Sequence, residues 1–88
     1  MKHLISNNEL LFSSFKKISL SEGIVLLNSL QEVNIDTETT GLNCHQDKLV
    51  LIQLGNKEIQ VLVDIVSFNF KIPEALKVYL NNSKQFNN

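Results

Sequence analysis

Residues 32–38 read EVNIDTE and alternate between two sets of side chains. Successive side chains of a β-strand point to opposite faces, so a period of two predicts a strand here. The sets are Val33, Ile35 and Thr37 on one face, and Asn34, Asp36 and Glu38 on the other. The next residues, TTGLN at 39–43, break the alternation and predict a loop. The strand therefore ends with two carboxylates, Asp36 and Glu38, on one face.

A helix is predicted before this strand. Ser19 and Glu22 have the spacing of a capping box, in which each side chain bonds the backbone amide of the other residue. Apolar residues then recur at helical spacing and predict a helix over about residues 20–30. Gly23 lies inside this helix and weakens it by roughly 1 kcal/mol relative to Ala. The expected core face consists of Leu20, Ile24, Leu27 and Leu30.

Two more strands and a second helix are predicted after the first strand. Apolar residues dominate 49–54 and 59–63, and the short turn between them requires these two strands to be antiparallel. Pro73 is typical of a first helical position and predicts a helix over residues 74–80. The apolar contacts of that helix are expected from Leu76, Val78 and Leu80.

The first 18 residues are the least patterned part of the chain. We expect residues 1–18 to form an N-terminal extension with a polar stretch at 6–8 that frays. Its expected short strand or extended segment consists of Leu10, Leu11, Phe12, Phe15 and Ile18. His3 lies near this terminus and is assigned no role.

Length and composition limit the classes of protein to consider. The 88 residues suffice for one small domain, and a formal charge of −1 provides no basic field to attract nucleic acid. All eight basic residues are Lys, so bidentate guanidinium contacts are absent. The single cysteine, Cys44, excludes an internal disulfide and a cysteine-based zinc finger. With no targeting segment and no apolar run of about 20 residues, we expect a cytoplasmic protein.

Asp36 and Glu38 are the residues that carry chemistry. Two neighbouring carboxylates repel each other unless a positive charge lies between them, and a divalent cation supplies it. Oxygen ligands on a rigid strand suit Mg²⁺ or Mn²⁺ better than zinc. Two such ions can activate a water and stabilise the leaving oxygen of a phosphodiester. The alternative is a solvated pair of surface acids.

The string DTETTGL at 36–42 resembles the first exonuclease motif of the DEDD 3′–5′ exonucleases. Within them it is most similar to ribonuclease D and to the proofreading domain of DNA polymerase I-type enzymes. The resemblance continues at residues 47–55, like the second strand of the family, and at 63–64, like the end of the third. It covers about residues 19–80, so we interpret 19–88 as the N-terminal portion of an exonuclease domain.

The resemblance implies a fold and a mechanism. The fold is α/β and ribonuclease H-like, with its first three strands in an antiparallel meander flanked by helices. Family members use the residues at Asp36 and Glu38 as catalytic metal ligands, with Asp36 on both ions and Glu38 on one. Their substrate-binding residues correspond to Thr39, Thr40, Gly41 and Leu42, which hold the terminal nucleotide. A metal-activated water then removes nucleoside monophosphates from the 3′ end of DNA or RNA.

The chain departs from the family in its carboxylates. The family has four, and this sequence supplies the first two. Asp47, Asp64 and Glu74 are not convincing replacements, because they fall in a loop, at a strand end and at a helix start. We therefore expect the chain to form a partial fold that lacks the later strands. We also expect the chain alone to be inactive as a nuclease.

Without a fourth strand, the strand with Asp36 becomes a sheet edge that invites pairing. The expected partner is a second polypeptide that completes the domain, or another copy of the chain along that edge. An alternative is an inactive, exonuclease-like remnant that serves as a binding or structural module.

Other residues allow weaker interpretations. Lys16, Lys17 and Lys48 fit either phosphate contacts or a solvated face. The five Phe residues are interpreted as core rather than as platforms on which bases stack.

Overall fold

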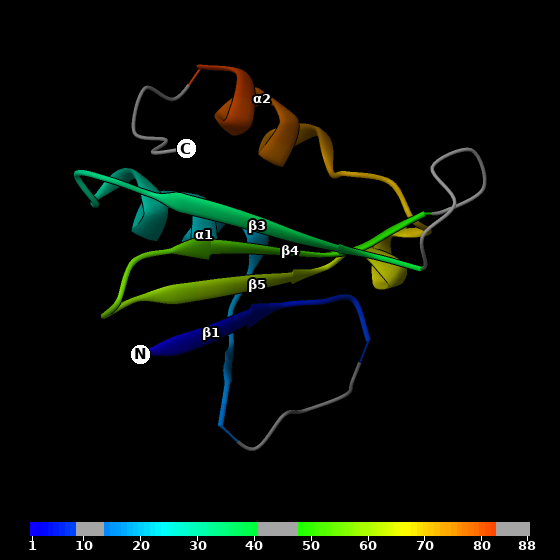
Figure 1. Cartoon of the computed structure of the whole chain (residues 1–88), viewed down its shortest axis with the longest axis horizontal. Coiled ribbons are helices and arrows are strands. Elements are labelled where there is room, and N and C mark those ends of the chain that lie inside the picture. The colour runs from blue at the N-terminus through cyan, green and yellow to red at the C-terminus, as the bar shows by residue number, and fades with distance from the viewer. Residues whose placement is uncertain (9–13, 41–47, 83–88) are drawn as a thin grey trace.

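A computed structural model of the chain describes residues 1–8, 14–40 and 48–82. These form one mixed sheet with the strand order β2-β1-β5-β4-β3 (Figure 1). The strands are β1 (Lys2–Ile5), β2 (Lys16–Lys17), β3 (Asn34–Thr39), β4 (Leu49–Gly55) and β5 (Gln60–Asp64). The helices are α1 (Leu20–Asn28), the 3-10 helix η1 (Ile65–Phe68) and α2 (Glu74–Asn82).

Strands β3, β4 and β5 form the predicted antiparallel meander. Asp36 of β3 lies opposite Gln53 of β4, and Leu51 of β4 lies between Glu38 of β3 and Asp64 of β5. Paired residues of neighbouring strands share a face of the sheet. The register therefore places Asp36, Glu38, Leu51, Gln53, Leu62 and Asp64 on one face, called the open face below.

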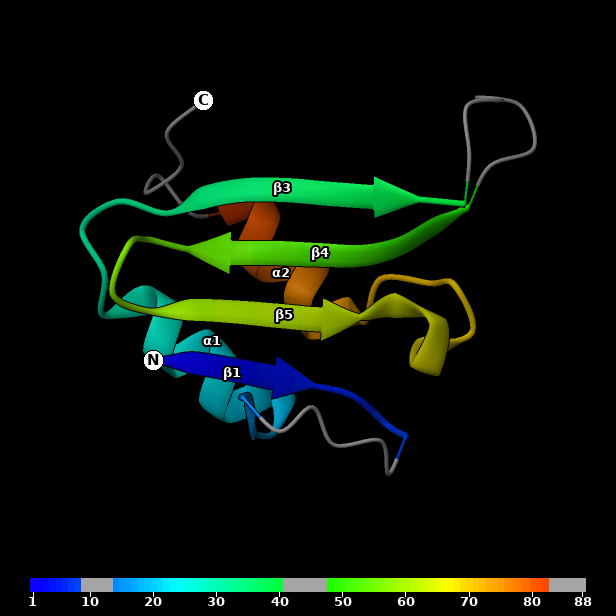
Figure 2. The ribbon, with the colours of Figure 1, turned by 60° about the horizontal axis from the view of Figure 1, so that its bottom comes forward.

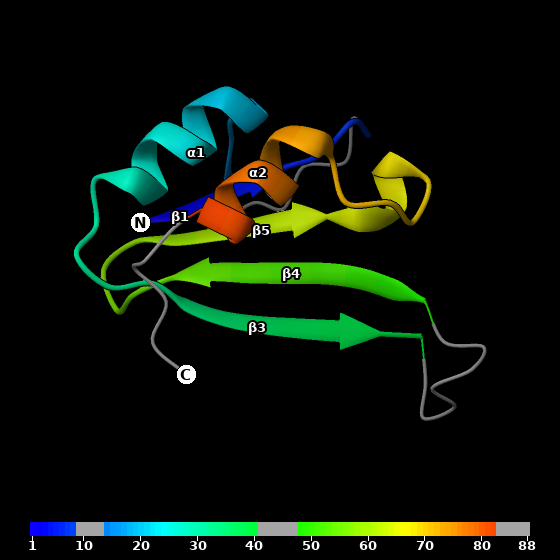
Figure 3. The ribbon, with the colours of Figure 1, turned by 90° about the horizontal axis from the view of Figure 1, so that it is seen from above.

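The two α-helices lie together on the opposite face of the sheet (Figure 3). Burial follows the same division, because alternate residues of β4 and β5 are buried under the helices. The core between sheet and helices includes Ile5, Leu27, Val33, Ile52, Leu54, Val61, Val63, Ile65, Leu76 and Tyr79. Among the described residues, neither α-helix covers the open face.

Helix α1 begins with the predicted capping box. The amide of Glu22 donates to Ser19 Oγ at 3.1 Å, and the amide of Ser19 donates to Glu22 Oε1 at 3.2 Å. These bonds satisfy two amides that a helix start otherwise leaves unpaired, and they lower the pKa of Glu22. The helix ends at Asn28, two residues before its predicted end.

A tight turn joins β4 to β5. Gly55 has φ 140°, a backbone conformation that favours glycine, and a Cβ there would overlap the carbonyl oxygen of Ile59. The side chain of Asn56 accepts hydrogen bonds from the amides of Glu58 and Ile59 at 2.9 and 2.8 Å. This turn lies at the end of the sheet opposite to the end of β3 (Figure 2), and its Lys57 is exposed.

The prediction that the polar N-terminal stretch frays is wrong. Strand β1 pairs in parallel with β5, which widens the meander to five strands together with β2. Ser6 is buried and its hydroxyl donates to Asp64 Oδ2 at 2.9 Å, while the amide of Asn7 donates to Ser67 Oγ at 2.9 Å. Pairing with β5 therefore orders the polar residues. The division of the chain at residue 18 stays a prediction.

The predicted apolar face of α2 is partly wrong. Leu76 is buried and Leu80 packs against the core, but Val78 is half exposed. Tyr79 takes the expected place of Val78 and is 5 % exposed. Helical spacing explains the difference. Residues 79 and 80 lie three and four positions after residue 76 and share its face of the helix, whereas residue 78 lies two positions after residue 76 and does not.

Candidate active site

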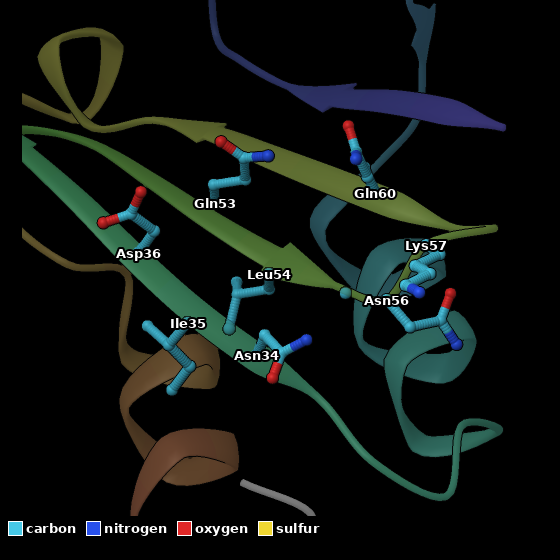
Figure 4. Close-up of a pocket in the computed structure, with 9 residues that line it drawn as sticks. Asn34, Ile35, Asp36, Gln53, Leu54, Asn56, Lys57 and Gln60 are labelled. Atoms are coloured by element: carbon cyan, nitrogen blue, oxygen red, sulfur yellow. The ribbon is translucent and has the colours of Figure 1, made fainter. Parts of the chain in front are cut away.

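Strand β3 places Asp36 and Glu38 at the edge of the sheet. It pairs with β4 alone among the described strands, and all six of its residues are exposed. Figure 4 shows Asp36 beside Gln53 of β4, whereas Ile35 lies on the side of β3 that faces α2. The two carboxylates therefore share the open face, as the alternating sequence predicts.

A shallow hollow of about 260 Å³ extends from Asp36 along the open face toward the β4–β5 turn (Figure 4). Its polar lining includes Gln53 opposite Asp36, and Asn34, Gln60 and Lys57 nearer the turn. Sequence analysis missed Gln53, although pairing the two predicted strands residue by residue brings it opposite Asp36. The amide of Gln53 offers both a hydrogen-bond donor and an acceptor next to the carboxylate.

The end of β3 is fixed by local hydrogen bonds. The amide of Thr37 donates to Asp36 Oδ1 at 2.9 Å, which holds this carboxylate along its own strand. The amide of Thr40 donates to the carbonyl of Lys48 at 3.0 Å, and the amide of Lys48 donates to Thr40 Oγ1 at 3.0 Å. These bonds close the base of the β3–β4 connection. Gly41 and Leu42 lie outside the described residues.

Asp64 shares the open face but does not join the pair. It is on β5, with β4 between it and Glu38, and its carboxylate accepts the hydroxyl of Ser6. The hydrogen bond directs this carboxylate toward the β1 side of the sheet. Glu74 is at the start of α2, on the other face, and Asp47 is outside the described residues.

The carboxylates present fit part of a metal centre. Over residues 1–8, 14–40 and 48–82, no group of three or more His, Cys, Asp or Glu side chains comes together. Two oxygen-bearing side chains suit one largely hydrated Mg²⁺ or Mn²⁺ ion, since Mg²⁺ commonly keeps several waters and takes one or two carboxylates. A pair of ions needs more ligands than Asp36 and Glu38 provide.

An aromatic and a basic side chain meet near the end of β3. The Nζ of Lys48 lies 4.9 Å from the centroid of the Phe70 ring. The interpretation of Phe70 as a core residue is wrong, because its side chain is 40 % exposed. Phe68, in contrast, packs against the core as expected.

Comparison with known proteins adds a family and a fold. A family model described as a 3′–5′ exonuclease matches residues 13–86. Among solved structures, the chain is similar to NrnC from Brucella melitensis, with 23 % sequence identity and a TM-score of 0.54. The similarity covers 98 % of this chain and 36 % of NrnC, so the chain spans about a third of that structure. No curated protein matches the sequence.

Within the described segments, every helix is too short or too polar to cross a membrane.

Proposed function

Because the chain belongs to the 3′–5′ exonuclease family, we propose that it supplies the first-motif carboxylates for removal of nucleotides from a nucleic-acid 3′ end. Its fold is a partial ribonuclease H-like fold, with the five-stranded sheet and two α-helices described above. The substrate is DNA or RNA, and the bond cleaved is a phosphodiester. A cytoplasmic location belongs to the same proposal.

One observation carries the proposal: the register of β3 with β4 places Asp36 and Glu38 on the same, open face near the end of β3. In this position both carboxylates are accessible to a hydrated ion and to a substrate strand. We assign them to Mg²⁺ or Mn²⁺, which when bound supplies an activated water and stabilises negative charge on the leaving oxygen. Asp36 keeps Oδ2 for the ion while Oδ1 accepts the amide of Thr37.

The residues after Glu38 are assigned to the substrate. Thr39 and Thr40 are exposed at the end of the strand, and the hydrogen bonds between Thr40 and Lys48 hold the backbone there. A fixed backbone can hold the terminal nucleotide without losing conformational freedom on binding. Gly41 and Leu42 complete the proposed substrate-binding set because they continue the family motif.

Efficient catalysis requires further carboxylates from outside the described residues. We propose that a second polypeptide, or another copy of the chain, joins at the edge formed by β3. The position of β3 supports the proposal, since among the described strands it pairs with β4 alone and an edge strand can extend a sheet.

A second candidate function is an inactive binding or structural module. The described residues favour it in one respect, because they bring together no more than two potential metal ligands at the motif. Such a module keeps the family fold and the edge strand but binds divalent ions weakly.

Thermal unfolding with and without Mn²⁺ tests the proposal. An ion bound only by the folded chain stabilises it by about 1.4 kcal/mol at ten times its Kd, or about 6–11 °C for a domain of this size. We expect this rise in the parent chain, its loss in Asp36→Asn, and an unchanged rise in Glu32→Gln, which removes an exposed acid outside β3. A rise that persists in Asp36→Asn contradicts the assignment, and no rise in a cooperatively folding parent favours the inactive module.

A further inference from the structure

Phe70 is held in an unusual backbone conformation that leaves its ring accessible. It has φ 61° and follows Asn69, which has φ 59°. Left-handed conformations are uncommon for bulky residues without a glycine, and they persist where the surrounding structure enforces them. Here the amide of Phe70 donates to the carbonyl of Ile65 at 3.0 Å, and that of Lys71 donates to Phe68 at 3.2 Å. The turn after η1 thus fixes the backbone of Phe70, whose side chain is 40 % exposed.

Lys48 connects this ring to the motif. Its ammonium group lies 4.9 Å from the ring centroid of Phe70, and its backbone is hydrogen-bonded in both directions to Thr40. Figures 1 and 2 show η1 at the same end of the sheet as the end of β3 and the start of β4. An exposed aromatic ring, a cation and the end of the proposed catalytic strand therefore occupy one region.

These groups match the chemistry of a single-stranded nucleic acid. Bases stack on exposed aromatic rings irrespective of sequence, and lysines neutralise the phosphates between the bases. A cation is needed here because Asp36 and Glu38 repel a phosphate backbone as it approaches. We propose that Phe70 and Lys48 form a nucleotide-binding subsite, in which a base stacks on Phe70 while Lys48 contacts a phosphate. This rests on the proposed function, because it assigns a place to the substrate of that site.

Fluorescence anisotropy with labelled single strands tests the subsite. The probes are a dodecamer of deoxythymidine and one of uridine, in EDTA and at several salt concentrations. We expect Phe70→Leu to weaken binding by about five- to one-hundred-fold, as loss of one base stack does, and Phe70→Tyr to stay close to the parent. Lys48→Gln should weaken binding and reduce the slope of log K against log salt by about 0.7, the value for one phosphate of a single strand.

Lys77→Gln is the matched control, because this exposed lysine lies on α2, on the face of the sheet opposite to the open face. It should leave the affinity for both probes unchanged. Phe70→Asn provides a second test of the ring, since Asn tolerates the left-handed conformation and its folding can be checked by thermal unfolding. We expect it to weaken binding like Phe70→Leu.

The proposal is overturned if Phe70→Leu and Phe70→Asn bind like the parent, or if Lys48→Gln and Lys77→Gln behave alike. It is also overturned if the parent chain binds neither probe. The Mn²⁺ effect at Asp36 is measured independently of nucleic-acid binding. A chain that binds Mn²⁺ but neither oligonucleotide therefore supports the proposed metal site and contradicts the proposed subsite. Binding of one probe alone identifies the substrate as DNA or RNA.

Discussion

His3 is a buried titratable residue whose surroundings lower its pKa. Its side chain is 7 % exposed, and within the described part of the chain neither ring nitrogen has a hydrogen-bond partner. Burial lowers the pKa of the imidazole, and the charges of Lys16 and of the N-terminal amine lower it further. The ring lies between Val61 of β5 and Lys16 of β2, so the charges that act on it are positive. The folded chain therefore favours the neutral ring.

We predict that acid destabilises the fold through His3. The unfolded state binds a proton near pH 6.5 and the folded state at lower pH, so the free energy of unfolding decreases as pH falls below about 6.5. His3→Leu should add about 1 kcal/mol at pH 7, because it removes unpaired polar atoms, and should lose less stability between pH 7 and 5.5. Urea unfolding of both chains across this range measures the difference, and parallel pH profiles would contradict the prediction.

At the scale of elements, α1 is packed closely on β1 through Gly23. A Cβ at residue 23 would overlap Cδ1 at the far end of the Ile5 side chain, so any residue larger than glycine requires Ile5 to shift. From sequence alone Gly23 is a weak point of the helix. The structure adds a packing requirement that opposes the gain in helix propensity expected for Ala.

A double-mutant cycle separates these two effects. We predict that Gly23→Ala alone destabilises the chain by about 1 kcal/mol, because Ile5 must move within a close-packed core. Ile5→Val removes the overlapping Cδ1, and in that background Gly23→Ala should be neutral or stabilising by up to about 1 kcal/mol, as helix propensity requires. Chemical denaturation of the four chains gives the coupling energy, and additive effects would show that the contact is unimportant.

The elements that sequence analysis predicts well are those with local signals. The capping box of Ser19 and Glu22 marks the start of α1, and the alternation before Thr39 identifies β3 and the shared face of its carboxylates. Strand β1 has only four residues and depends on pairing with β5, more than 50 residues later, so no local pattern reveals it. The exposure of Phe70 is equally hidden, since no glycine marks its left-handed turn.

At the scale of the whole molecule, the sheet has two unequal faces, and β3 is the last strand at one edge of the described sheet. Helices α1 and α2 cover one face, whereas Leu51 and Leu62 are only half-buried on the open face (Figure 3). Strand β3 has one neighbour among the described strands and is exposed on both of its faces. Exposed edge strands are templates for pairing with another chain unless charges or bulges block them. In β3 the two carboxylates and the register shift lie from Asp36 onward, which leaves Asn34 and Ile35 as the part of the strand open to pairing. The second polypeptide proposed to complete the catalytic site and another copy of this chain would therefore bind the same surface, the edge formed by β3.

We predict that the chain self-associates along β3 when no completing polypeptide is present. Ile35 is 39 % exposed on this strand, and a lysine there should oppose edge pairing by placing a charge within it. In sedimentation velocity, the parent chain should form larger species as concentration rises, and Ile35→Lys should remain monomeric. Val25→Lys adds the same charge on the outer face of α1, where Val25 is 70 % exposed, and should associate like the parent. Thermal unfolding establishes that each variant is folded. If Val25→Lys alone blocks association, the contact runs through α1 and not through β3. A parent chain that is monomeric and unfolds cooperatively at every concentration contradicts the prediction that the edge formed by β3 needs a partner.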